Sequence, residues 1–114
     1  MNKEIKSKWV EALRSGDYKQ TTETLKERNV YGESYCCLGV LCDIHSKETG
    51  TKWSGPNSLG DCDYLHGTGV LPELVVEWAD IGSDLPKAAG SSLALLNDTG
   101  TSFLEIAQLI EDNL

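Results

Sequence analysis

The sequence has no long apolar run and none of the motifs of the common nucleotide-binding or hydrolytic enzymes. No apolar stretch approaches the roughly 20 residues that a helix needs to cross a bilayer. A Gly-rich phosphate loop, a Walker pattern and a Gly-x-Ser-x-Gly elbow are all missing. The only histidines are His45 and His66, so few groups suit acid–base catalysis or metal binding. These absences argue against a membrane-spanning protein, a P-loop enzyme and an α/β-hydrolase.

Basic residues are also scarce. The 114 residues include 10 Lys or Arg against 18 Asp or Glu, for a net charge of −8. Residues 1–35 contain seven basic and six acidic residues, a net of +1, and residues 36–114 contain three and twelve, a net of −9. Such a surface repels phosphate backbones. We therefore expect no direct DNA binding, although residues 93–107 look like the first helix, turn and second-helix start of a helix-turn-helix unit.

The N-terminal segment is charged and lacks the apolar stretch of a secretory signal peptide. We expect a cytoplasmic protein with reduced cysteines. The length predicts a single domain over residues 1–114.

Hydrophobic periodicity predicts an α+β fold in which three or four helices pack on a small antiparallel sheet. The clearest signal is a capping box, in which Ser102 precedes Glu105 and an apolar stripe begins at Phe103. From the N-terminus we expect a helix at 3–15, an irregular β-hairpin within 17–34, a strand near Tyr35 that becomes a helix at 38–47, a long loop at about 51–69, a helix from Leu71, a loop at 81–90, a short helix or strand at 93–96, and a final helix after Ser102.

Three of the four cysteines lie in the apolar run of residues 35–43, at Cys36, Cys37 and Cys42. Free cysteine is among the most buried residue types and packs like a small hydrophobic side chain. We therefore predict that the thiols belong to the core.

A zinc site is the alternative for part of this set. Cys42 and His45 are three residues apart, and Cys62 and His66 are four apart, so two such pairs could supply four ligands. The spacing matches no common zinc-finger or zinc-ribbon pattern. We favour core cysteines, expect no cofactor and assign no catalytic residue.

Polar residues beside aromatic ones suggest a ligand-binding site. Arg14 and Gln20 carry planar donors, Tyr18 offers a stacking face, and Asn97 and Asp98 add donors and acceptors before the last helix. Together these five residues could bind a polar, planar ligand. As the alternative, Asn97 and Asp98 form a turn and Arg14 is a solvated helix end.

The ordered set of motifs resembles a family of small bacteriophage and prophage proteins with no assigned activity. The motifs are Trp9, Leu13-Arg14-Ser15-Gly16, Tyr18 and Gln20, then Tyr35-Cys36-Cys37-Leu38-Gly39-Val40-Leu41-Cys42-Asp43, then Leu71-Pro72 with Trp78, and finally Leu96-Asn97-Asp98, Gly100, Ser102-Phe103 and Ile106-Ala107. The resemblance implies expression in the cytoplasm of an infected bacterium. It also implies a role as an accessory protein that counters host defence.

We therefore expect a small non-catalytic binding protein that sequesters a polar ligand such as a host immune nucleotide signal. One alternative is an acidic protein–protein inhibitor of a host defence or nucleic-acid-binding protein. Another is a metal-dependent hydrolase of a nucleotide signal that uses Asp61 and Asp63. A homodimer or higher homo-oligomer is expected if subunits share the pocket, and no membrane partner is expected.

Overall fold

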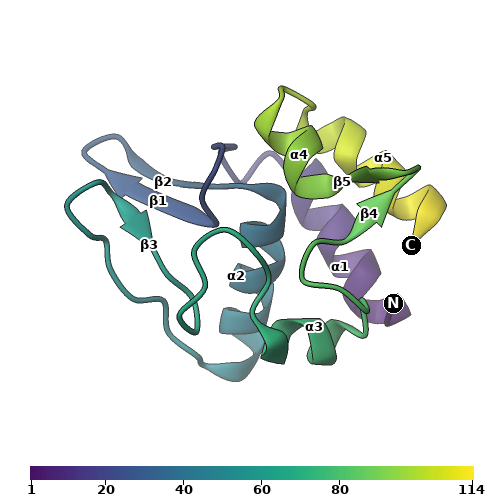
Figure 1. The fold of residues 1–114 in the computed structure, drawn as a ribbon, viewed down its shortest axis with the longest axis horizontal. Helices are drawn as coiled ribbons and strands as arrows, with labels where there is room; N and C mark the ends of the chain where they lie inside the picture. The colour runs from purple at the N-terminus through teal and green to yellow at the C-terminus, as the bar shows by residue number, and fades with distance from the viewer.

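The computed structural model describes residues 1–114 and contains five helices and five short strands (Figure 1). The helices are α1 (Lys3–Arg14), α2 (Cys37–Thr49), α3 (Glu73–Ala79), α4 (Leu93–Asp98) and α5 (Phe103–Asn113). The strands are β1 (Lys26–Asn29), β2 (Gly32–Tyr35), β3 (Asp61–Cys62), β4 (Lys87–Ala88) and β5 (Ser91–Ser92). The predicted α+β class is confirmed, and α4 is the segment for which the sequence allowed either a helix or a strand.

The main sheet has three antiparallel strands in the order β2-β1-β3. Lys26 of β1 lies opposite Tyr35 of β2 on one side and Cys62 of β3 on the other. A second, two-stranded sheet joins β4 and β5. The predicted hairpin corresponds to β1 and β2. The segment predicted as a loop at 51–69 is largely irregular, but it contributes β3 to the sheet.

The chain between α1 and β1 runs along the open side of β2. The Thr21 N–H donates to the Tyr35 carbonyl (2.8 Å), and the Tyr35 N–H donates to the Lys19 carbonyl (2.8 Å). These bonds hold Tyr18 and Gln20 near the start of α2.

Four helices begin at side-chain caps, and at α4 Ser92 Oγ accepts a hydrogen bond from the N–H of Leu95 (3.3 Å). The Asn2 side chain accepts a hydrogen bond from the N–H of Ile5 at α1 (2.9 Å). Ser102 Oγ accepts from the N–H of Glu105 at α5 (3.2 Å), which confirms the predicted cap. At α2 the cap is a thiol, because Cys36 Sγ accepts from the N–H of the third residue on (3.4 Å). Each cap satisfies a backbone donor of the first helical turn.

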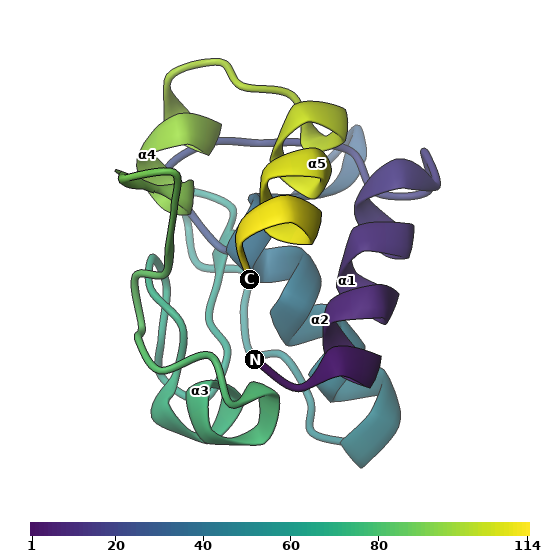
Figure 2. The same ribbon diagram turned by 90° about the vertical axis from the view of Figure 1, so that its right-hand side faces the viewer.

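Helix α2 lies at the centre of the molecule, with the three-stranded sheet on one side and α1, α4 and α5 on the other (Figures 1 and 2). Every residue from Cys37 to His45 is buried. The Trp9 indole of α1 is fully buried and its Nε1–H donates to the Cys37 carbonyl (2.9 Å). The helices therefore pack mainly on one another, around α2, within one apolar cluster of 23 buried residues.

Gly39 allows α2 to lie directly against the chain that enters β1. A Cβ at this position would be 1.7 Å from the Leu25 carbonyl oxygen. The sequence counts Gly39 mildly against a helix, but here the missing side chain is what permits the helix to pack at this distance.

All four cysteines are buried and free, which confirms the prediction of core thiols. Burial raises the pKa of Cys36 to about 11 and raises the pKa values of Cys37 and Cys42 well above the usual value. Thiols with such pKa values remain protonated near neutral pH and are poor nucleophiles.

None of the five helices combines the length and the apolar character that crossing a membrane requires.

Candidate functional site

The five residues predicted to bind a ligand lie in three separate places. Arg14 is at the junction of α1 and α5, where its Nη2 contacts α5. Tyr18 lies against the middle of α2. Gln20, Asn97 and Asp98 meet between α4 and the chain that follows α1. The structure thus brings three of the five together and leaves Arg14 and Tyr18 apart from them.

Asn97 is the centre of a buried polar cluster. Its side chain is 1% exposed. The Oδ1 atom accepts hydrogen bonds from Gln20 Nε2 (2.9 Å) and from the N–H of Cys37 (3.1 Å), and Nδ2 donates to the Thr21 carbonyl (2.8 Å). Asp98 Oδ1 accepts from the backbone N–H of Glu23 (2.9 Å). The side chains of Asn97 and Asp98 therefore form hydrogen bonds within the protein, which join α4 to the start of α2 and to the segment before β1.

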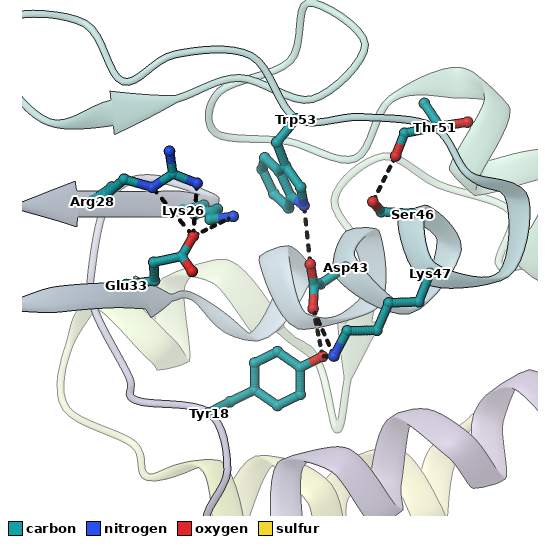
Figure 3. Close-up of polar contacts among 9 residues, drawn as sticks. All are labelled: Tyr18, Lys26, Arg28, Glu33, Asp43, Ser46, Lys47, Thr51 and Trp53. Carbon is teal, nitrogen blue, oxygen red and sulfur yellow. Dashed lines mark hydrogen bonds and ion pairs between the residues drawn. The ribbon is translucent and has the colours of Figure 1, made fainter.

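Tyr18 belongs to a second network, around the buried carboxylate of Asp43 (Figure 3). Tyr18 Oη donates to Asp43 Oδ2 (2.6 Å), and Trp53 Nε1 donates to Asp43 Oδ1 (3.1 Å). Lys47 Nζ is 3.3 Å from Asp43 Oδ2 and donates to Tyr18 Oη (3.1 Å). Burial, followed by the hydrogen bond to Asp43, raises the pKa of Tyr18, so this hydroxyl is a donor and not a base.

A buried cation adjoins the same tryptophan. Lys26 Nζ lies 5.0 Å from the Trp53 ring centre and 5.3 Å from that of Tyr35, and it forms an ion pair with Glu33 (2.7 Å). Arg28 also contacts Glu33, with its Nη2 atom at 3.0 Å (Figure 3). Hydrogen bonds from Lys26 and then Arg28 lower the pKa of Glu33. Sequence reasoning placed Trp53 against the core but missed Lys26, because nothing local marks a lysine whose aromatic partners come from two other segments.

The alternative zinc ligands are not brought together. Cys42 and Cys62 are buried, His66 is exposed on a loop, and His45 Nδ1 is hydrogen-bonded to Tyr64 Oη (2.5 Å). Nowhere do three or more His, Cys, Asp or Glu side chains gather as a metal ion would require. Asp61 and Asp63, the carboxylates proposed for a metal-dependent hydrolase, likewise belong to no such group of three.

His45 links stability to pH. It is buried, with its ring edge-on to Tyr64 and Trp78. Burial disfavours the imidazolium form and lowers the pKa of His45 below its unfolded value of about 6.5. The unfolded chain therefore binds more protons between the two pKa values, and stability falls as the pH decreases through this window.

We expect the free energy of unfolding to be constant just above about pH 6.5 and to fall below it by at most about 1.4 kcal/mol per pH unit. Urea unfolding at pH 7.5, 6.5 and 5.5 measures this slope. His45→Gln should flatten it, whereas His66→Gln, at the exposed histidine, should leave it in place. An unchanged slope in His45→Gln would assign the pH dependence to other groups.

Three surface grooves each contain one predicted residue. Arg14 lines a groove of about 530 Å³ beside α1 and α5. Tyr18 lines one of about 340 Å³ between α1 and α2, and Gln20 lines one of about 140 Å³ at the edge of β2. The grooves differ in charge. The groove of Arg14 is lined by three basic and two acidic residues. Acidic residues outnumber basic ones in the other two grooves, by three to two around Tyr18 and by two to one around Gln20. Among the three grooves, only that of Arg14 is therefore net positive.

Comparison with protein families gives one result. A family model described as a domain of unknown function (DUF8296) matches residues 1–114. The chain belongs to the DUF8296 family. Comparisons with curated proteins and with solved structures gave no match.

In this DUF8296 chain, the net-positive groove is the one beside α1 and α5. Its full lining is Lys3, Lys6, Ser7, Val10, Glu11, Arg14 and Glu111. Sequence reasoning selected Arg14 and did not select the two lysines. Their signal is the spacing of residues 3, 6, 7, 10 and 14, which places all five on one stripe of an α-helix.

Proposed function

We propose that this protein is a small non-catalytic binding protein that captures an anionic ligand of nucleotide size in the groove beside α1 and α5. The observation that carries the proposal is the gathering of Lys3, Lys6 and Arg14 around one groove on a chain whose net charge is −8. A volume of about 530 Å³ is within the range of about 300–1,000 Å³ that is typical of small-ligand sites.

Charge favours this groove over the others for an anion. The carboxylates that line the grooves of Tyr18 and Gln20 outnumber the basic groups there. A phosphate entering either groove would meet a repulsive potential, whereas the groove of Arg14 attracts it. Arginine and lysine are also the residues that bind phosphate through charge-assisted hydrogen bonds.

The resemblance to phage proteins supports the biological half of the proposal. A phage accessory factor that acts against host defence would work in the host cytoplasm, and a nucleotide immune signal is an anionic target of suitable size. Sequestration of such a signal requires binding and no bond cleavage.

Reversing one charge in the groove tests the proposal. We expect the wild-type protein to bind at least one member of a panel of cyclic nucleotides and ADP-ribose derivatives by isothermal titration. Lys6→Glu should weaken that binding at least about tenfold, because one favourable charge contact becomes a repulsive one. Binding should also weaken with added salt.

Lys52→Glu is the matched control, since Lys52 is exposed and does not line the groove. It changes the net charge by the same amount, so it should alter affinity by less than about threefold. Equal losses in the two variants would argue against a site at this groove. Absence of binding across the panel would favour the rival function, an acidic inhibitor of a host protein.

A further inference from the structure

We propose that the ligand of this groove carries two anionic groups, one at each end. This inference rests on the proposed function and adds the chemical class of the ligand. It comes from the order in which the lining side chains follow one another along α1: two cations, then a hydroxyl, an apolar side chain and a carboxylate, then a third cation.

The cations are too far apart for a single phosphate. An α-helix rises about 1.5 Å per residue, so Lys6 and Arg14 are separated by about 12 Å along α1 and Lys3 and Arg14 by about 16 Å. The lining residues between them are Ser7, Val10 and Glu11, and none of these is a cation. A monophosphate can therefore contact the lysine end or the arginine end, but a ligand with two separated anions can contact both.

Arg14 contacts α5 through one nitrogen of its guanidinium group. Its Nη2 atom is 2.5 Å from Glu111 Oε2 and donates to Gln108 Oε1 (3.0 Å), both on α5. A guanidinium group has five N–H donors in a fixed plane. The donors on Nε and Nη1 have no partner in the protein, so they remain for an anion in the groove.

The carboxylates set a requirement on ligand charge. Glu11 and Glu111 line the same groove, and Glu111 neutralises part of the Arg14 charge. A single anion at the arginine end shares the Arg14 guanidinium group with Glu111, so it gains little binding free energy there. A second anion at the lysine end supplies additional binding, and its connection to the first removes most of the entropy cost of binding twice.

A series of α,ω-alkane bisphosphates, with phosphates spaced from about 6 to about 16 Å, measures the separation directly. Each is compared by isothermal titration with the alkyl monophosphate of the same chain length. We expect an affinity maximum at a spacing near 12 Å, the separation of Lys6 and Arg14 along α1. At that length the bisphosphate should bind at least about tenfold more tightly than the monophosphate.

Two variants assign the ends. Arg14→Gln and the double variant Lys3→Ala with Lys6→Ala should each remove the advantage of the bisphosphate over the monophosphate of the same chain length. Circular dichroism and urea unfolding check that both variants are folded. Lys52→Ala, outside the groove, should retain the full advantage.

Mono- and bisphosphates that bind equally at every length would overturn the two-anion inference and leave the proposed binding function standing. The same holds if the advantage persists in Arg14→Gln. No binding of any phosphate probe or nucleotide by the folded wild-type protein would overturn both.

Discussion

Replacing Gly39 with alanine should destabilise the protein by at least about 3 kcal/mol or prevent folding. The added Cβ would lie 1.7 Å from the carbonyl oxygen of Leu25 and 2.6 Å from its carbonyl carbon. These are backbone atoms of a fully buried residue, so no side-chain rotation relieves the overlap. Alanine gains about 1 kcal/mol over glycine in helix propensity, which is too little to offset the clash.

Gly69→Ala is the matched control for this prediction. Gly69 has no atom within 4 Å of an added Cβ and does not have a positive φ. Alanine should therefore be neutral there, or stabilising by up to about 1 kcal/mol through the entropy of the unfolded chain. Urea unfolding of both variants decides the matter. A Gly39→Ala variant as stable as Gly69→Ala would mean that α2 and the chain at Leu25 do not pack this closely.

Replacing Asn97 with alanine should cost about 3–4 kcal/mol, since it removes three hydrogen bonds to two other segments from a buried site. The N–H of Cys37, in the first turn of α2, would lose its 3.1 Å partner, and the Thr21 carbonyl would lose its 2.8 Å donor. Each buried group left without a partner costs about 1–3 kcal/mol. The Gln20 carboxamide keeps a second acceptor, the Thr101 carbonyl, at 2.9 Å and should suffer least.

Asp98→Ala distinguishes the buried amide from its exposed neighbour. Asp98 accepts from Glu23 N–H and Asn97 Nδ2 but is exposed to water, so its loss should cost about 1 kcal/mol or less. Thermal and urea unfolding of the two variants measure the difference. Similar small losses would show that water replaces the Asn97 contacts. Loss of ligand binding in a fully stable Asn97→Ala variant would instead return this residue to the binding site.

The sequence correctly predicted the helices and strands that depend only on residues close together in the chain. The cap at Ser102, the apolar stripe of α1 and the change from strand to helix after Tyr35 all follow from neighbouring residues, and each is present. The position of β3 was missed because two residues, Asp61 and Cys62, form a strand only through pairing with β1. No pattern within the predicted loop at 51–69 contains that information.

The candidate site shows the same division. Asn97 and Gln20 have the donors and acceptors that a ligand would need, and the sequence cannot distinguish binding a ligand from binding the protein's own backbone. Arg14 was selected for its guanidinium group, and it alone of the predicted five lines the net-positive groove. The spacing of the two lysines places them on one stripe of α1 with Arg14, but the groove itself forms only because α5 lies beside α1 (Figure 2).

The complete burial of the native sulfur atoms has a practical use. A cysteine introduced on the exposed surface of α1 or α5 would be the only thiol open to a maleimide dye, because the native ones are shielded and protonated. Fluorophores could then report the separation of the two helices in solution without prior removal of any natural residue. Slow labelling of the four interior thiols would meanwhile count the transient openings of the molecule.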